Sequence, residues 1–239
     1  MNFSDSIFPY LAGTKFSNAI SLQITDRTDI LQGRIDFLIA YCRGKRVLHL
    51  GCTDHLEIMD EKIQRNTWLH KLLTEVAAEC IGLDNNQEAL AHARLRGFSN
   101  VFFTDVVTDT PPEVVRGKTW DVLVMGEIIE HIGNPVSFLH ALRERYGLLV
   151  SEIVLTTPHA FRFKNFTRAA LRGKEIVNSD HRFWFTPYTL ARVCSEAGVQ
   201  PKQFWLVENM PPTRFAWFKK ILLNRYPAFR DTLIMTCRF

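Results

Sequence analysis

The sequence of 239 residues has no apolar run near the roughly 18 residues that a membrane-spanning helix needs. Its first residues, MNFSDSIFPYLAGTKF, lack the basic start and the continuous apolar segment of a secretory signal peptide. Cysteine is also scarce, with five widely spread residues and no CxxC pair, so neither a zinc site nor a disulfide framework is indicated. We therefore expect a cytoplasmic protein with reduced thiols.

A strong excess of charge is missing as well, because the net charge is only +4, which argues against a dedicated nucleic-acid binder. The positive charge is nevertheless uneven. Residues 161–174 and residues 211–230 each carry five basic side chains, several aromatic ones and no acidic one. Such stretches are typical of a surface that contacts an anionic or amphipathic partner, although a solvated positive face is the simpler interpretation. Within the second stretch, residues 215–223 suit a helix packed on a sheet, a dimer contact or a peripheral membrane contact.

What is present is an alternation of short apolar runs and amphipathic stretches, without internal repeats, low-complexity tracts or a flexible linker. A helix is expected at 26–43. After it, the pattern predicts strands at 46–50, 80–83, 101–104, 121–125, 153–156, 203–207 and 232–237, and helices at 68–79, 87–96, 135–145 and 187–197. Strands that alternate with helices imply an α/β fold with a parallel sheet and helices on both faces. The long segment before the last strand allows that strand to run antiparallel.

Chemically suitable residues follow the first four strands, where ligands bind in an open α/β sheet. Gly51 follows the first strand and lets a ligand approach the backbone, and Asp84 follows the second, where a carboxylate can accept from ribose hydroxyls. Asp105 follows the third strand, within reach of an adenine amine, and Glu127 follows the fourth. Each residue alone is more often an ordinary turn residue. Their succession along one sheet edge indicates a shared binding crevice.

These segments resemble the class I methyltransferases that use S-adenosylmethionine (SAM), especially the branch of ubiquinone-biosynthesis O-methyltransferases. The resemblance covers residues 40–210 and rests on VLHLGC, IGLD, FTDV, WDVLVMGEIIEHIGNP, VLTTPHAF and DHRFWFTPYTLARVCSEAGV. Its most specific part is E-x-x-E-H-x-x-N-P, followed later by D-H-R-F-x-F-T. Residues 171–190 also resemble methyltransferases encoded with enzymes of surface-glycan assembly.

The resemblance implies a Rossmann-like sheet of seven strands, mostly parallel with an antiparallel last strand, and SAM bound across the first four strand ends. Residues 44–239 would form this domain, with basic insertions at 159–186 and 210–230, after an N-terminal helical segment, 1–43, on the substrate side. By position, the residues at SAM would be Gly51 and Cys52 by the methionine part, Asp84 and Asn85 by the ribose, Asp105 and Val106 by the adenine, and Glu127 across the pocket.

The first loop departs from the family pattern in two ways. Gly51 is its only glycine, and it stands 33 residues before Asp84, against roughly 20 in a compact dinucleotide unit. The missing glycines argue against NAD, whose pyrophosphate needs such a turn, whereas SAM has no phosphate. The extra residues around 56–70 lengthen the first loop and helix. Trp68 and His70 then form either a lid or, as we prefer, the start of the helix.

Methyl transfer to a hydroxyl or amine needs an aligned nucleophile and a base for its proton. His131, one turn after Glu127, is the first candidate, because the ordinary pKa of an imidazole lies near neutrality. His181 is the second candidate and His159 the third, although a single histidine is more often structural.

A metal-assisted alternative involves Glu127, Glu130, His131 and His181. These four resemble, position by position, the metal site of small-RNA 2′-O-methyltransferases, where two carboxylates and two imidazoles hold a divalent ion. The same pattern occurs in metal-free relatives, where Glu130 orients or caps, and we expect no metal.

The sequence thus predicts a SAM-dependent methyltransferase for a hydroxyl or amine of a small-molecule or glycan-type acceptor. The acceptor would be anionic or lipid-linked if the basic segments contact it. Two alternatives stay open: a metal-assisted RNA 2′-O-methyltransferase and a non-catalytic binding protein of the same fold.

Overall fold

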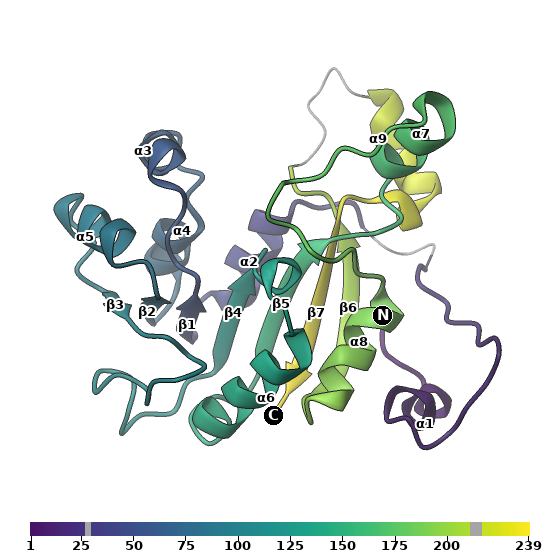
Figure 1. Cartoon of the computed structure of the whole chain (residues 1–239). Helices are drawn as coiled ribbons and strands as arrows, with labels where there is room; N and C mark the ends of the chain where they lie inside the picture. The colour runs from purple at the N-terminus through teal and green to yellow at the C-terminus, as the bar shows by residue number, and fades with distance from the viewer. Residues whose placement is uncertain (27–29, 211–216) are drawn as a thin grey trace.

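The computed structural model describes residues 1–26, 30–210 and 217–239. Its centre is a sheet with the strand order β3-β2-β1-β4-β5-β7-β6 (Figure 1). The strands are β1 (Arg46–Leu50), β2 (Glu79–Asp84), β3 (Val101–Phe103), β4 (Val122–Gly126), β5 (Ile153–Pro158), β6 (Gln200–Val207) and β7 (Thr232–Arg238). Strands β1 to β5 are parallel, and β7 runs antiparallel to both of its neighbours. The predicted seven-stranded sheet with an antiparallel last strand is confirmed.

Helices cover both faces of this sheet (Figure 1). On one face, α1, α6 and α8 pack with side chains such as Leu48, Leu123 and Leu155. On the other face, α2 and α4 pack with Val47, Val122 and their neighbours, and α3 and α5 pack together near β3. The bounds are α1 (Phe8–Leu11), α2 (Arg34–Cys42), α3 (Leu56–Gln64), α4 (Leu69–Val76), α5 (Gln87–Leu95), α6 (Pro135–Tyr146), α7 (Phe163–Arg172), α8 (Pro187–Glu196) and α9 (Trp217–Arg225).

Local sequence accounts for the element boundaries. All six residues of β5 are buried, as expected of a strand covered on both faces. Helix α6 begins after Asn134, whose side chain accepts from the Ser137 amide, and Pro135 occupies the first helical position. Helix α8 begins in the same manner at Thr186, which forms a capping box with Thr189. The two N-terminal signals fix where these helices start.

The helix expected at 26–43 is shorter than predicted, because α2 begins only at Arg34. The Gly33 backbone is extended and bridges Glu208 of the chain that follows β6, with the Arg34 amide donating to the Glu208 carbonyl at 2.7 Å. This pairing holds the residues before α2 in an extended form. Residues 27–29 lie outside the described part. Helix α2 packs into the core, and the division of the chain at residue 43 stays a prediction.

The long connection between β1 and β2 contains two helices, α3 and α4, rather than one lengthened helix. Trp68 stands just before α4 and His70 lies in its first turn, and both side chains are buried. Burial at the start of a helix confirms the preferred interpretation and excludes a lid formed by these two side chains.

The two basic insertions lie at the edge of the sheet where the parallel strands end (Figure 1). The first contains α7, and the described part of the second contains α9 and a short 3-10 turn, η3 (Pro227–Phe229). The prediction for residues 211–216 lies outside the described part. Among the described residues, no helix is both long and apolar enough to cross a membrane.

Candidate functional site

Two adjoining cavities open at the carboxyl ends of the parallel strands. The first has a volume of about 610 Å³ and the second about 470 Å³. Four residues line both cavities and mark where they meet: Gly51, Asp84, Asn85 and Ile128. The expected residues divide between them, with Cys52 and Glu127 in the first and Asp105 and Val106 in the second. The strand-end residues therefore surround one continuous space.

The backbone conformation at the junction of the cavities requires a glycine at position 51. Its φ of +65° lies in the left-handed region, and a β-carbon there would stand 2.4 Å from Cδ1 of Ile128. The Gly51 amide also donates to the Leu83 carbonyl at 2.8 Å, which ties the end of β1 to the end of β2. A side chain at this position would be strained and would collide with the cavity wall.

Asp84 holds the loop that replaces the glycine-rich turn. Its Oδ2 accepts from the Thr53 amide at 2.9 Å and from the Thr53 hydroxyl at 2.8 Å. Its Oδ1 accepts from the Asn86 amide at 3.0 Å and from no other group in the described ranges. Because a carboxylate oxygen has two lone-pair sites, Oδ1 keeps capacity for one further donor in the cavity.

The lining of the second cavity is more apolar than that of the first. Apolar side chains, including Val106, Ile132 and Phe138, form much of its lining. The Asp105 Oδ1 accepts from the Val107 amide at 2.9 Å, so this carboxylate also shapes its own loop. An apolar slot with a carboxylate at its rim suits a flat, nitrogen-bearing ring.

Glu127 lies at the end of β4 with an unusual backbone conformation. Its φ is 58°, a left-handed value that costs a non-glycine residue about 1 to 3 kcal/mol. The Glu127 amide donates to the Thr156 carbonyl at 2.9 Å, and its Oε1 accepts from the Thr156 hydroxyl at 3.3 Å. Strained backbone at a cavity wall is a common sign of a functional position.

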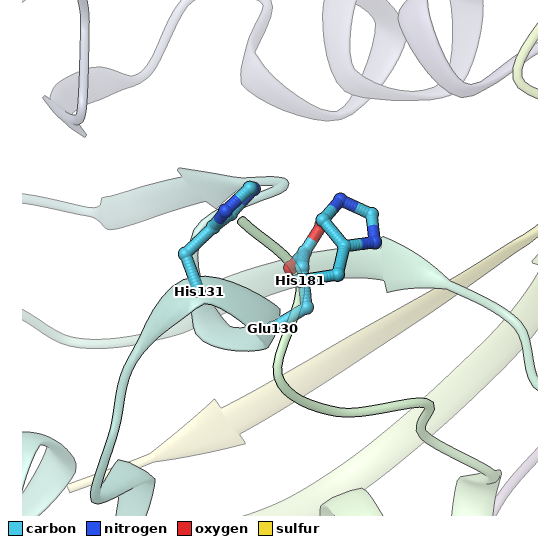
Figure 2. A group of neighbouring side chains, drawn as sticks. All are labelled: Glu130, His131 and His181. Carbon is cyan, nitrogen blue, oxygen red and sulfur yellow. The ribbon is translucent and has the colours of Figure 1, made fainter. Parts of the chain in front are cut away.

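Glu130, His131 and His181 form a compact group at the edge of the first cavity. One potential ligand atom from each residue lies within 4.8 Å of the others. Glu130 and His131 belong to the 3-10 turn η2 (Ile129–His131), and His181 comes from the loop between α7 and α8 (Figure 2). The two imidazole rings are perpendicular, with centroids 4.7 Å apart. Glu127, the fourth residue of the metal alternative, is outside this group.

Burial shifts the pKa values of two members of this group, Glu130 and His181. Glu130 is fully buried, and neither of its carboxylate oxygens has a hydrogen-bond partner among the described residues. Burial, and after it the charge of Glu127, raises the pKa of Glu130 to about 8. Burial also lowers the pKa of His181, with a further contribution from His131. Within the described part of the chain, the Nδ1 of His181 has no hydrogen-bond partner. A buried carboxyl without partners is costly and indicates a group kept for binding or chemistry.

Comparisons with known proteins agree on one class. The chain is 25% identical to a ubiquinone biosynthesis O-methyltransferase of Azoarcus sp. over 179 residues, 70% of each protein. It is 24% identical to the enzyme of the same description from Dinoroseobacter shibae, of whose length it spans 61%. No family model matches the chain.

The fold is shared with solved methyltransferases. The magnesium protoporphyrin IX methyltransferase of Synechocystis has a TM-score of 0.52 at 13% identity and covers 86% of this chain, which covers 82% of it. The methyltransferase domain of a bacterial Hen1 has a TM-score of 0.54 at 17% identity, with 86% and 97% covered. The sequence relatives and the shared fold together support a SAM-dependent methyltransferase. The same comparisons support SAM as the cofactor, and they favour an enzyme over a non-catalytic protein of the same fold.

The cavities are compatible with SAM in this enzyme. The polar first cavity has room beside Gly51 for the methionine part, and the apolar second cavity suits the adenine. Between them, Oδ1 of Asp84 offers an acceptor for a ribose hydroxyl. Thr53 already donates twice to Oδ2, and the contact of Asp84 with the ribose stays a prediction.

His159, the third candidate base, lies away from the cavities. It is absent from the lining of either cavity and is fully buried after β5. Burial lowers its pKa to about 4, and its ring packs on Phe161. His159 is therefore a neutral histidine in the core.

Several lining residues were not predicted from the sequence. Arg34 at the start of α2 lines the first cavity and donates to the Thr156 hydroxyl at 3.4 Å. Asn178 and Asp180 line the same cavity from the loop that carries His181. The sequence did hold a signal for Thr53, because this residue lies in the first loop, where the family pattern has glycines.

Proposed function

We propose that this enzyme transfers a methyl group from SAM to a hydroxyl oxygen of a polar acceptor held in the first cavity. The observation that carries this proposal is the Glu130–His131–His181 group at the edge of the cavity that Gly51, Asp84 and Glu127 line. SAM supplies a methyl group activated by a sulfonium. The relatives named O-methyltransferases support oxygen as the acceptor atom.

The residues of the chain would hold the reactants and receive the proton. His131 is half-buried in the lining and is proposed to accept the hydroxyl proton. Its ring is held edge-to-face against His181, which is in turn packed against Trp184. Arg34 and Lys62 both line this cavity, and Lys62 pairs with Asp54, so Arg34 would pair with the carboxylate of SAM.

The lining supports an acceptor rich in hydroxyl groups. In the first cavity, the loop from α7 to α8 contributes Asn178, Asp180 and His181, all able to hydrogen-bond. Apolar residues are few on this side, which suits a glycan-type acceptor better than a purely apolar one.

The test is incubation of the purified enzyme with methyl-labelled SAM and a panel of acceptors. The panel would contain free sugars, nucleotide sugars, lipid-linked sugars, catechols and short RNAs. We expect label on a sugar hydroxyl that resists mild alkali, because alkali hydrolyses methyl esters and leaves methyl ethers intact. Label only on RNA, or on an apolar catechol, would contradict the proposed acceptor class.

A second candidate, metal-assisted methylation of an RNA 2′-hydroxyl, is favoured by one specific observation. The two oxygens of Glu130 and the Nδ1 of His181 are buried without partners, and they lie with His131 in a group of ligand size. A carboxylate and two imidazoles suit Mn²⁺, Co²⁺ or Zn²⁺, and such an ion would activate a hydroxyl. The fold shared with the bacterial Hen1 domain is consistent with this candidate.

Unfolding experiments on Glu130→Met separate the two candidates. In chelator, we expect this variant to be more stable than the wild type by about 1 to 3 kcal/mol, because it removes a buried carboxyl without partners. If the metal candidate holds, Mn²⁺ at about 100 times its Kd stabilises the wild type by about 2.7 kcal/mol and leaves Glu130→Met unchanged. Denaturant titrations with and without Mn²⁺ measure both effects.

The control is Glu113→Met, which replaces an exposed glutamate outside both cavities. It should keep any response to Mn²⁺ and show no gain in chelator. A wild type that does not respond to Mn²⁺ rules out the metal candidate and leaves the proposed metal-free transfer.

A further inference from the structure

His181 lines the first cavity, but no hydrogen bond within the described residues orients its imidazole ring. Its Nδ1 is buried without a partner there. Residues 171–180, which lead to it, are all exposed, so burial does not hold the preceding loop. A histidine at a reactive site is usually oriented by a hydrogen bond on its second ring nitrogen. The direction of this ring must therefore be set by another contact.

Trp184 supplies that contact. Its ring meets the ring of His181 edge-to-face, with centroids 6.0 Å apart and an interplanar angle of 78°. His181 makes a second contact of this kind with His131, at 4.7 Å and 86°, and Figure 2 shows these two imidazoles side by side. Aromatic rings favour edge-to-face packing, so the indole favours one direction of the imidazole. The place of His181 beside His131 thus depends on where Trp184 stands.

Arg162 and Glu175 hold Trp184 in place. The Arg162 guanidinium lies over the indole ring, 4.6 Å from its centroid, and the indole Nε1 donates to Oε1 of Glu175 at 3.0 Å. The guanidinium is itself fixed, because its Nε donates to Oδ1 of Asn165 at 2.9 Å. A cation over the face of a tryptophan is attracted by the ring, so this contact restricts the movement of the indole.

Two backbone hydrogen bonds bring these side chains together. The Arg182 amide donates to the Glu130 carbonyl at 2.8 Å, which ties the loop to η2. The Ala160 amide donates to the Phe185 carbonyl at 2.9 Å, which ties the same loop to the chain just before α7. Arg162, the residue that precedes α7, is thereby held beside the loop. The first basic insertion thus contributes a cation to the support of the site.

We propose that Trp184, held by Arg162, is a positioning residue that directs the imidazole of His181 towards His131 at the edge of the first cavity. Trp184 is absent from the lining of both cavities, so it acts through His181 and not on the reactants. It occupies position x of the D-H-R-F-x-F-T stretch, which the resemblance leaves unspecified. The consequence for methyl transfer rests on the proposed function, whereas the orientation of the ring does not.

The first test measures the orientation of the ring without turnover. Nuclear Overhauser effects between the ring protons of His131 and His181 are recorded on protein with labelled histidine. Chelator is present, because a bound ion could hold both rings. We expect the effect in the wild type and its loss in Trp184→Ala and in Arg162→Met. Trp184→Phe should retain it, because an aromatic ring still meets the imidazole.

The second test is kinetic and uses the acceptor found in the panel. Trp184→Ala and Arg162→Met should each lower kcat by about 10-fold to 100-fold, because a misplacement of about 1 Å can cost about 100-fold. The KM for SAM and the Kd of S-adenosylhomocysteine should stay close to the wild-type values, which also shows that the variants are folded. Trp184→Phe should restore most of kcat. If Trp184→Ala does not fold, Arg162→Met leaves the indole in the protein and gives the same comparison.

The matched controls are Trp217→Ala and Arg116→Met. They change an exposed tryptophan on α9 and an exposed arginine, both outside the two cavities. Both proteins should keep the effect between the two imidazoles and the kcat of the wild type.

Two outcomes would overturn the proposal. One is an effect between the rings that stays unchanged in Trp184→Ala and Arg162→Met. The other is a loss of that effect in Trp184→Phe or in the controls that is as complete as in Trp184→Ala. Loss of the effect in Trp184→Ala with an unchanged kcat would uphold the positioning of His181 and contradict the proposed function instead.

Discussion

Replacing His131 by alanine is expected to lower kcat of methyl transfer by about 10² to 10⁴-fold and to leave SAM affinity nearly unchanged. The proposal assigns His131 to the acceptor proton and not to the cofactor. Its side chain lies with Glu130 and His181 and lines the first cavity alone. Gly51 and Asp84, by contrast, line both cavities at their junction. The measurement is kcat with the acceptor found in the panel, together with the Kd of S-adenosylhomocysteine by calorimetry.

The matched control for this prediction is His140→Ala, which removes an exposed histidine on α6. It should keep kcat within about twofold of the wild type, as expected of a surface change. Added imidazole should restore part of the rate of His131→Ala, because a small base can enter the space that the side chain leaves. A kcat for His131→Ala close to that of the wild type would remove the assigned base.

Replacing Asp84 by alanine is expected to weaken the binding of S-adenosylhomocysteine by about 100-fold or more. The carboxylate would lose a charge-assisted hydrogen bond to the ribose, and such bonds contribute about 1.5 to 3 kcal/mol. It would also release Thr53, whose amide and hydroxyl both donate to Oδ2, so that the loop after β1 loses its anchor. Calorimetric titration measures the combined loss.

Thr53→Val separates the two contributions of Asp84. It removes only the hydroxyl that donates at 2.8 Å and leaves the Asp84 carboxylate in place. A loss of about fivefold to tenfold is expected, the value of one hydrogen bond. If Thr53→Val weakened binding as much as Asp84→Ala, the carboxylate would act by holding the loop, and direct contact with the ribose would be contradicted.

The strand-end residues could be predicted because their placement follows from a general rule. The carboxyl ends of parallel strands meet at one edge, so residues that follow four such strands are brought together whatever the loops do. Gly51, Asp84, Asp105 and Glu127 needed only the strand pattern to be correct. The burial of all the residues of β5 and most of β1 and β4 made that pattern readable.

Contacts between distant segments could not be predicted in the same way. The early start predicted for the N-terminal helix was wrong because Gly33 pairs with Glu208, 175 residues later. Arg34, whose amide takes part in that pairing, lines the first cavity. His159 follows β5 in sequence, like a site residue, but its burial removes it from the cavities.

The side of α9 that faces inward could not be predicted from the sequence either. Lys219 and Lys220 are adjacent, and their pattern alone does not show which of them faces inward. The position of Glu208 at the end of the sheet decides it, because the buried carboxylate requires a cation and Lys219 is the one that reaches it.

A crystal structure of the protein with S-adenosylhomocysteine tests the central claim most directly. We expect the adenine in the cavity lined by Val106 and Phe138, a ribose hydroxyl on Oδ1 of Asp84, and the amino-acid end beside Gly51. The sulfur would then face the cavity edge that carries Glu130, His131 and His181. A ligand bound elsewhere, or one with its sulfur turned away from these three residues, would contradict the account.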